Sequence, residues 1–186
     1  MCLASTTCTI MANNTGNGSA KTLQEPDGTV LSKKGCTSSG WSMWQISRRG
    51  GLGTLGQEQL DWLEKDVKGL SASTPIVLFA HIPLWAVYPK WGWGTDDAEQ
   101  ALSLVKRFGS VTVLNGHIHQ IMQKVEGNIT FHTARGTAFP LPVPGSGPKP
   151  LPVVVEAAQL KKMLGLTSVS YTETNHTLAI VDSTLG

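Results

Sequence analysis

Three histidines stand directly after stretches that the sequence predicts to be buried strands. His81 follows the apolar run at 76–80, and His117 and His119 come shortly after the run at 111–114. In sheets of parallel strands, ligands bind beyond the carboxyl ends of the strands. Neutral imidazole is a good ligand for Zn, Fe, Mn or Ni. The three histidines are therefore candidates to hold one metal ion, or to contribute to two ions that carboxylates complete.

The H-x-H spacing predicts a common direction for two of these side chains. In an extended turn, side-chain direction repeats every two residues, so the imidazoles of His117 and His119 should point the same way. Gly116, directly before them, permits a sharp turn or a close backbone approach. The alternative is a hydrogen-bonded structural role, which is common for a lone histidine after a strand. We expect His132, within a predicted strand, and His176, at a predicted hairpin tip, to be structural or solvated.

The neighbours of these histidines each have two candidate roles. Asn115 can orient the loop or bind a substrate, and we favour the orienting role. The loop after His81 carries four aromatic residues that either pack or form a wall facing a substrate: Trp85, Tyr88, Trp91 and Trp93.

Hydrophobic periodicity predicts the elements that would position these side chains. A capping box at 54–57 predicts the start of a helix with Leu60, Leu63, Val67 and Leu70 on one face. We expect further helices at 96–108 and 156–164, strands at 76–80 and 111–114, and hairpins that pair 121–126 with 129–134 and 167–174 with 178–182. Six prolines between positions 140 and 152 predict a stiff surface loop.

Composition sets the class of protein. The chain has 186 residues, of which 40% are hydrophobic and 15% charged, and this suits one domain. It has no apolar run long enough to span a membrane and no N-terminal basic and apolar signal, so we expect no membrane partner and leave the compartment unassigned. A net charge of +2 does not indicate a nucleic-acid partner. The cysteines, at positions 2, 8 and 36, form no CxxC motif.

The chain divides into two unlike segments. Residues 1–50 are rich in Ser, Thr, Asn, Gly and Lys and show no sustained hydrophobic period, so we expect an irregular, poorly ordered segment. Residues 51–186 carry every predicted helix and strand and all five histidines. The sequence therefore predicts an α/β domain in the second segment.

Three motifs of the second segment resemble one protein family. A strand ends in A-H-I-P-L at 80–84, the sequence V-T-V-L-N-G-H-I-H follows at 111–119, and Q-E-Q-L-D-W-L-E-K precedes both at 57–65. Together they resemble the C-terminal half of the calcineurin-like metallophosphoesterases, over about residues 51–183. The G-H-x-H motif at the right distance from the first histidine carries most of the resemblance.

The resemblance implies a fold and a chemistry. It implies part of a β-sandwich flanked by helices, and hydrolysis of a small-molecule phosphomonoester or phosphodiester. Two divalent ions, Zn, Fe or Mn, share a bridging aspartate and a hydroxide in that family. By motif, His81 and His117 would bind one ion and His119 the other. Such a pair of ions generates a nucleophile at neutral pH and stabilises the leaving oxygen.

Half of the family's site is missing from the sequence. The upstream motifs D-x-H, G-D-x-x-D and G-N-H-D/E do not occur, and residues 1–50 contain no histidine. A shifted reading frame is one explanation. Over 35–50 the shifted frame permits V-H-F-I-G-L-V-N-V-A-D-L-K-A-G-G, and over 1–8 it permits V-F-G-E-H-D-V, which resembles the missing G-N-H-D motif. Sequencing of the coding DNA across codons 1–55 tests this hypothesis, because stop codons in the alternative frame would refute it.

These observations lead to three functional hypotheses. The first is a truncated metal-dependent phosphoesterase with little or no activity of its own. The second is a non-catalytic metal- or ligand-binding remnant, and the third is a structural domain. We further expect unpaired edges on the strands at 76–80 and 111–114, and hence self-association. Zinc affinity should be weak and should fall below pH 6, because histidine titrates near pH 6.5.

Overall fold

The computed structural model describes residues 52–172 and 177–186 in full, and before residue 52 it describes the backbone of five strands. These are β1 (Ile10–Ala12), β2 (Lys21–Glu25), β3 (Gly28–Lys33), β4 (Cys36–Trp41) and β5 (Gln45–Ile46). His176, and the hairpin tip on which it was expected, lie outside the described residues.

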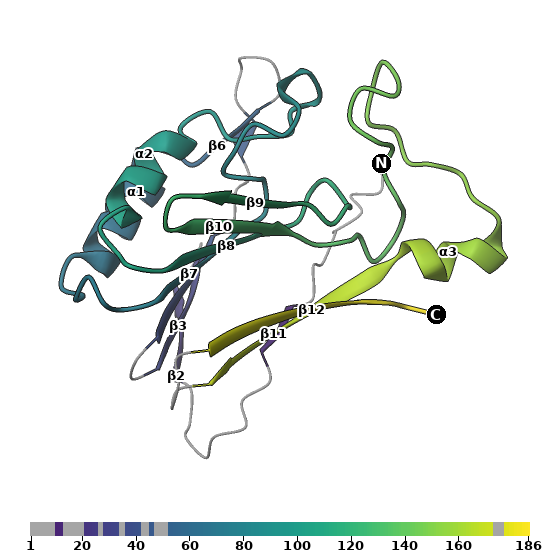
Figure 1. Cartoon of the computed structure of the whole chain (residues 1–186). Coiled ribbons are helices and arrows are strands. Elements are labelled where there is room, and N and C mark those ends of the chain that lie inside the picture. Colours follow the sequence, from purple (N-terminus) through teal and green to yellow (C-terminus); the bar gives the residue numbers. More distant parts are fainter. Residues whose placement is uncertain are drawn as a thin grey trace.

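A mixed sheet forms the centre of the fold (Figure 1). Its strand order is β2-β3-β4-β7-β8-β10-β9. The later strands are β7 (Ile76–Ala80), β8 (Val111–Asn115), β9 (Gln123–Glu126) and β10 (Ile129–Thr133). The pairs β4–β7, β7–β8 and β8–β10 are parallel, and the remaining pairs are antiparallel. The carboxyl ends of β7, β8 and β10 therefore meet at one edge of the sheet, as expected for the first two.

The sheet corrects two predictions. The edges of β7 and β8 are not free, because β7 lies between β4 and β8, and β8 lies between β7 and β10. Strands β2, β3 and β4 also belong to this sheet. The expectation of an irregular segment at 1–50 is therefore wrong at these positions. A strand can be held in a sheet by backbone hydrogen bonds even when its sequence has no hydrophobic period. Hydrophobic periodicity therefore did not reveal these three strands.

Two helices cover one face of the central sheet (Figure 1). α1 (Gly56–Val67) and α2 (Ala98–Val105) pack on the main hydrophobic core, which includes Leu60, Leu63 and Val67 of α1 as predicted. The second helix is shorter than the expected 96–108. None of the helices in the described ranges has the length and apolarity that a bilayer crossing requires.

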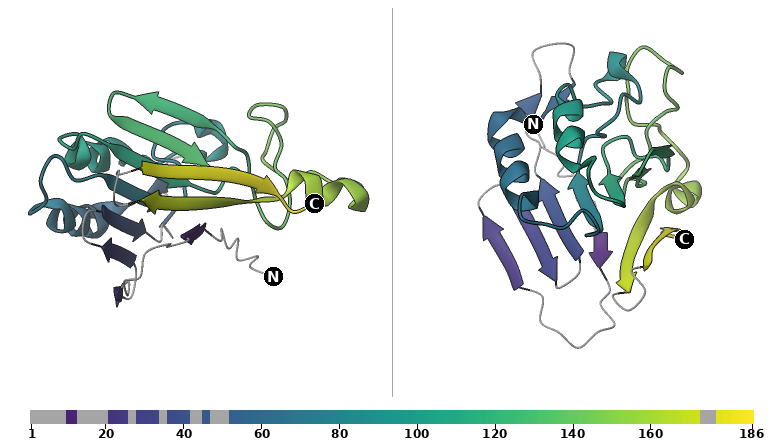
Figure 2. Two further views of the ribbon diagram at one scale, coloured as in Figure 1. Left: turned by 60° about the horizontal axis from the view of Figure 1, so that its bottom comes forward. Right: turned by 60° about the vertical axis from the view of Figure 1, so that its left-hand side comes forward.

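A second, smaller sheet packs against the first. It has the order β1-β11-β12, with β11 (Gly165–Thr172) antiparallel to β12 (Thr177–Thr184), so the strands of the second expected hairpin are confirmed. A small apolar cluster joins the sheets through Val77 and Leu114 on one side and Val169 on the other. Figure 2 shows the β11–β12 hairpin away from the two helices. The fold is therefore α/β, with helices and strands in separate layers.

The remaining elements are short. β6 (Gly53–Thr54) pairs with β5 in a two-stranded sheet, η1 (Pro89–Trp91) is a 3₁₀ turn, and α3 (Ala157–Met163) is an exposed helix at the predicted position. The hairpin β9–β10 is confirmed, with Gly127 at a φ of 60° in its turn.

The start of α1 is stabilised from another part of the chain. The predicted capping box at 54–57 is wrong, because the N-terminal residue Leu55 has no side-chain cap of its own. Instead the Asp97 carboxylate accepts hydrogen bonds from the backbone N–H groups of Leu55 (2.9 Å) and Gly56 (2.8 Å) and from the Thr54 hydroxyl (3.0 Å). A carboxylate makes stronger, charge-assisted bonds at the positive end of a helix than a hydroxyl does.

Replacement of Asp97 tests this long-range cap. Asp97→Ala should lower the free energy of unfolding by about 1–2 kcal/mol, because it leaves the first amides of α1 without their acceptor. Urea denaturation measures the change. Asp96→Ala is the matched control, since Asp96 is exposed and its backbone N–H bond to the Gly53 oxygen survives the substitution. Equal destabilisation by the two variants would contradict the cap.

Candidate metal site

The ends of β7 and β8 are fastened to each other beside His81. The amide nitrogen of the Asn115 side chain donates to the backbone oxygens of Ala80 (2.7 Å) and Ile82 (3.4 Å), which flank His81. The oxygen of His81 itself accepts from the Gly116 N–H at 3.0 Å. Asn115 therefore has the orienting role expected for it, and it fixes the backbone from which the His81 side chain projects.

His117 lies at the centre of a tight turn. The Ile118 N–H donates to the Gly116 oxygen at 2.7 Å, and His117 between them has a φ of 66°. This is a γ-turn of the rare kind with a positive φ at its middle residue. The expectation of an extended H-x-H segment is therefore wrong, because His117 and also His119, at a φ of 56°, adopt left-handed backbone conformations. Strain of this kind in a non-glycine residue is frequently found at functional sites.

His119 is held by the segment that follows β10. Its Nδ1 lies 2.7 Å from the backbone oxygen of Phe139. Because a carbonyl oxygen can only accept, Nδ1 carries the proton and Nε2 keeps a free lone pair. Gly136 makes the contact possible, since a Cβ at that position would lie 2.6 Å from Nδ1 of His119 and 2.9 Å from the Phe139 oxygen.

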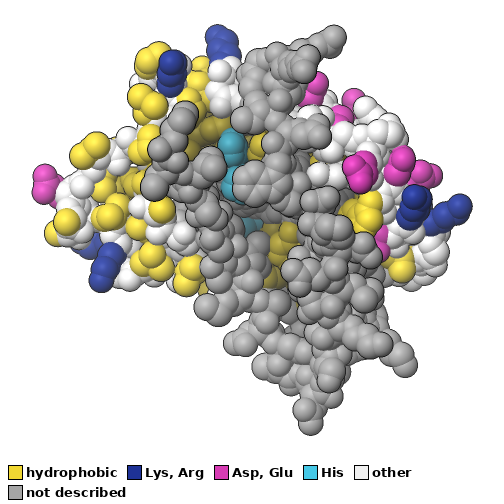
Figure 3. All heavy atoms as spheres, turned by 180° about the vertical axis from the view of Figure 1, so that it is seen from behind, with side chains coloured by type: hydrophobic (Ala, Val, Ile, Leu, Met, Phe, Trp, Pro, Cys, Tyr) yellow, Lys and Arg dark blue, Asp and Glu magenta, His cyan; other side chains and the backbone are white. Residues whose placement is uncertain are grey.

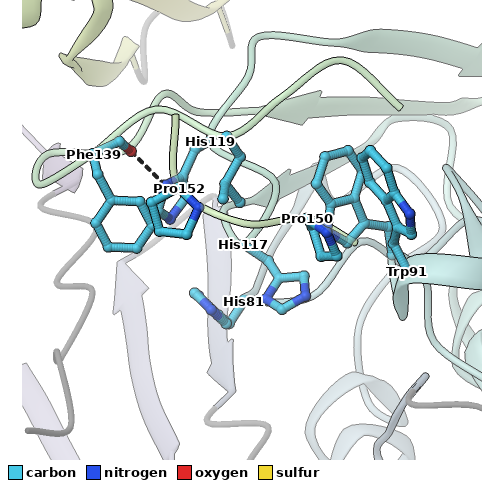
Figure 4. Close-up of a pocket in the computed structure, with 9 residues that line it drawn as sticks. His81, Trp91, His117, His119, Phe139, Pro150 and Pro152 are labelled. Carbon is cyan, nitrogen blue, oxygen red and sulfur yellow. Dashed lines mark hydrogen bonds between the residues drawn. The ribbon is translucent and has the colours of Figure 1, made fainter. Parts of the chain in front are cut away.

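The three histidines line a single pocket (Figure 4). Its volume is about 290 Å³. The other lining residues are apolar or aromatic: Trp91, Trp93, Phe139, Leu141, Pro150 and Pro152. Histidine side chains also reach the surface at the centre of the face seen in Figure 3. The three histidines that the sequence indicated therefore lie together around one cavity.

Some lining residues were expected and others were not. Of the aromatic residues for which packing and a wall were both considered, Trp91 and Trp93 line the pocket and also pack on each other. Trp85 packs on Phe131 in the core, with ring centroids 5.1 Å apart. Nothing in the sequence placed Gly136 or the residues at 139–152 beside the histidines. The proline-rich composition of the loop indicated that it is stiff, but it did not indicate where the loop lies in the fold.

His132 has the structural role expected for it. Its Nδ1 lies 3.1 Å from the side-chain nitrogen of Gln123, and its Nε2 lies 3.1 Å from the Asp182 carboxylate. The His132 ring is buried between strands of the two sheets and lies outside the pocket.

No protein-family model and no curated protein matches the chain. The resemblance to the metallophosphoesterases therefore rests on the sequence motifs at 57–65, 80–84 and 111–119 alone.

The geometry of two histidines suits one metal ion. The ring centroids of His81 and His117 are 5.3 Å apart and the rings are inclined at 78°. Two imidazoles on one tetrahedral zinc, with nitrogen about 2.1 Å from the metal, place their centroids about 5 Å apart. Within the described ranges no group of three His, Cys, Asp or Glu side chains is arranged to hold a metal, so the convergence of His119 on the same ion stays a prediction.

Burial keeps these histidines neutral. It lowers the pKa of His117 to about 4, and the neighbouring His81 and His119 add to the effect. The pKa of His81 is lowered by burial and then by His119, and the pKa of His119 is lowered by burial against the opposing hydrogen bond to Phe139. Neutral imidazole is the form that binds a metal. The loss of zinc affinity, expected below pH 6, should therefore occur at a lower pH.

A two-metal centre does not fit the described residues. A bridging carboxylate is needed to hold two ions together, and no Asp or Glu is among the described residues that line the pocket. The donor set consists of neutral imidazoles in a mostly apolar cavity. Such a set suits Zn or Fe better than Mn, which prefers oxygen ligands.

Proposed function

We propose that the chain is the C-terminal part of a metal-dependent phosphoester hydrolase. In this proposal His81 and His117 hold one divalent ion, His119 lies beside it, and the chain has no measurable hydrolytic activity of its own. The observation that carries the proposal is the gathering of three neutral histidines on one cavity at the carboxyl ends of parallel strands. The packing of a second sheet on the first further supports the sandwich that the motif resemblance implies.

The residues of the pocket have distinct tasks in this proposal. A divalent ion in such a site polarises a phosphoryl oxygen and supplies hydroxide near neutral pH. Asn115 and the γ-turn at His117 fix the backbone of the ligands, so little ordering is needed on binding. His119, protonated on Nδ1, offers Nε2 as an acceptor. The apolar wall would lower the local polarity and so strengthen electrostatic interactions with the phosphoryl group.

The lack of charged side chains among the described lining residues favours binding over turnover. Stabilising both the attacking and the leaving oxygen requires a second ion or a further charged group. The described lining residues include no carboxylate and no cation, so the expected activity is binding of metal and phosphate ester without hydrolysis. The non-catalytic metal-binding hypothesis is therefore kept beside the hydrolase as a second candidate function.

A zinc titration tests the proposal. Calorimetry should detect about one zinc per chain at pH 7, and His117→Ala should weaken its affinity at least tenfold because a direct ligand is lost. His132→Gln is the matched control, since it removes a histidine outside the pocket. Unchanged affinity in His117→Ala, or an equal loss in His132→Gln, would refute the site.

Hydrolysis is followed in the same samples. Release of p-nitrophenol from bis(p-nitrophenyl) phosphate should stay at the level of free zinc. Turnover that exceeds this level and disappears in His117→Ala would show that the described residues suffice for catalysis, and the claim of a missing half-site would then be wrong.

A further inference from the structure

The apolar side of the pocket is built as a fixed wall. Trp91 and Trp93 pack at 84° with their centroids 5.1 Å apart, and Tyr88 packs on Trp91 at 76° and 5.0 Å. Together with Ile118 of the H-x-H turn, the two tryptophans form a separate hydrophobic cluster under the site. The wall and the histidines therefore share one rigid support.

The proline-rich loop supplies further lining of the pocket and is anchored at three points. At its base the Val153 N–H donates to the Pro140 oxygen at 3.0 Å. Next to the histidines the Gln120 side-chain nitrogen donates to the oxygens of Pro142 (2.6 Å) and Leu141 (3.3 Å). At its tip Gly145 lies against the Tyr88 ring. A loop closed on itself and stiffened by proline presents a preformed surface.

The pocket has room for a planar group beside a phosphoryl group. An apolar cavity of about 150 Å³ suffices for benzene. The present cavity, at about 290 Å³, leaves room for a phosphoryl group at the histidines and one group of that size against the wall.

From these features we infer that the site takes a phosphoester in which one esterified group is planar, apolar and about as large as a benzene ring. The inference rests on the proposed metal binding, because the ion must hold the phosphoryl group. Phe139, Trp91 and Leu141 are the residues that select the planar group.

Two esters of equal charge test the inference. Phenyl methyl phosphate and dimethyl phosphate are titrated into the zinc-saturated chain, and the phenyl ester should bind at least tenfold more tightly, because its ring leaves water for the apolar wall. Leu141→Ala, at a half-buried position of the wall, should reduce this ratio at least threefold while zinc affinity is retained. Trp91→Leu is a second variant with the same expectation. Val125→Ala, an exposed apolar position on β9, is the matched control and should keep the ratio.

The outcomes separate the two proposals. Equal affinity for the two esters, with zinc bound, would overturn the inference and leave the metal site standing. A ratio that neither wall variant changes would also overturn it, because the ring would then bind elsewhere. Absence of zinc binding would overturn the proposed function and this inference with it.

Discussion

Acidification of the metal-free chain is expected to lower its free energy of unfolding by about 3 kcal/mol between pH 6.5 and pH 4 through His117 alone. The pKa of His117 is lowered from 6.5 to about 4 in the folded chain, mainly by burial. As the pH falls below 6.5, the unfolded chain takes up the proton first and is stabilised relative to the folded chain. The stability is therefore fully present above pH 6.5 and is lost as the pH approaches 4.

Two further histidines act in the same direction. The pKa values of His81 and His119 are also lowered by burial, so each adds to the loss. The contributions do not simply add, because protonation of one histidine makes protonation of its neighbours harder. The figure for His117 is therefore to be compared with the difference between the wild type and a variant that lacks this imidazole.

Urea denaturation at pH 7 and pH 5 separates the effect of histidine titration from that of the carboxylates. About 2 kcal/mol of the loss should occur by pH 5, where ordinary Asp and Glu side chains are still ionised. His117→Gln should show a smaller fall over the same interval, because glutamine does not titrate. Stability that is equal at the two pH values in the wild type would mean that His117 is not buried in its neutral form.

The sequence predicted most of the elements that carry the site. The apolar runs at 76–80 and 111–114 proved to be β7 and β8, and the helical face of Leu60, Leu63 and Val67 proved to be buried. Such patterns are readable because a buried strand or an amphipathic helix repeats its apolar residues along the chain. The histidines were found because they come directly after these strands.

The sequence could not reveal the contacts made between distant segments. The carboxylate that caps α1 comes from Asp97, and the loop that closes the pocket is joined to the histidine turn by Gln120. Neither partner has a sequence pattern, because hydrogen bonds between segments far apart depend on the tertiary fold. The positive φ values of His117 and His119 were missed for a similar reason, since local preference places such angles at glycine.

Gly136→Ala is expected to lower the free energy of unfolding by about 2–3 kcal/mol, although it adds a single methyl group. The new Cβ would lie 2.6 Å from Nδ1 of His119 and 2.9 Å from the backbone oxygen of Phe139, and these are the two atoms of the hydrogen bond that holds the imidazole. The Phe139 oxygen belongs to the backbone and yields little. The His119 ring must therefore turn away, and the buried imidazole loses its acceptor.

The same displacement should reach the metal site. Without the bond to Phe139, the tautomer and orientation of His119 are no longer fixed. Zinc affinity should therefore fall in Gly136→Ala if His119 is a ligand of the ion. Gly147→Ala is the matched control, because nothing lies within 4 Å of a Cβ at that position and its φ is not positive. Urea denaturation and zinc titration of the two variants measure both effects. A Gly136→Ala chain as stable as Gly147→Ala would mean that His119 does not pack against residue 136. A destabilised chain with unchanged zinc affinity would restrict the ion to His81 and His117, the pair whose ring separation alone already suits one metal.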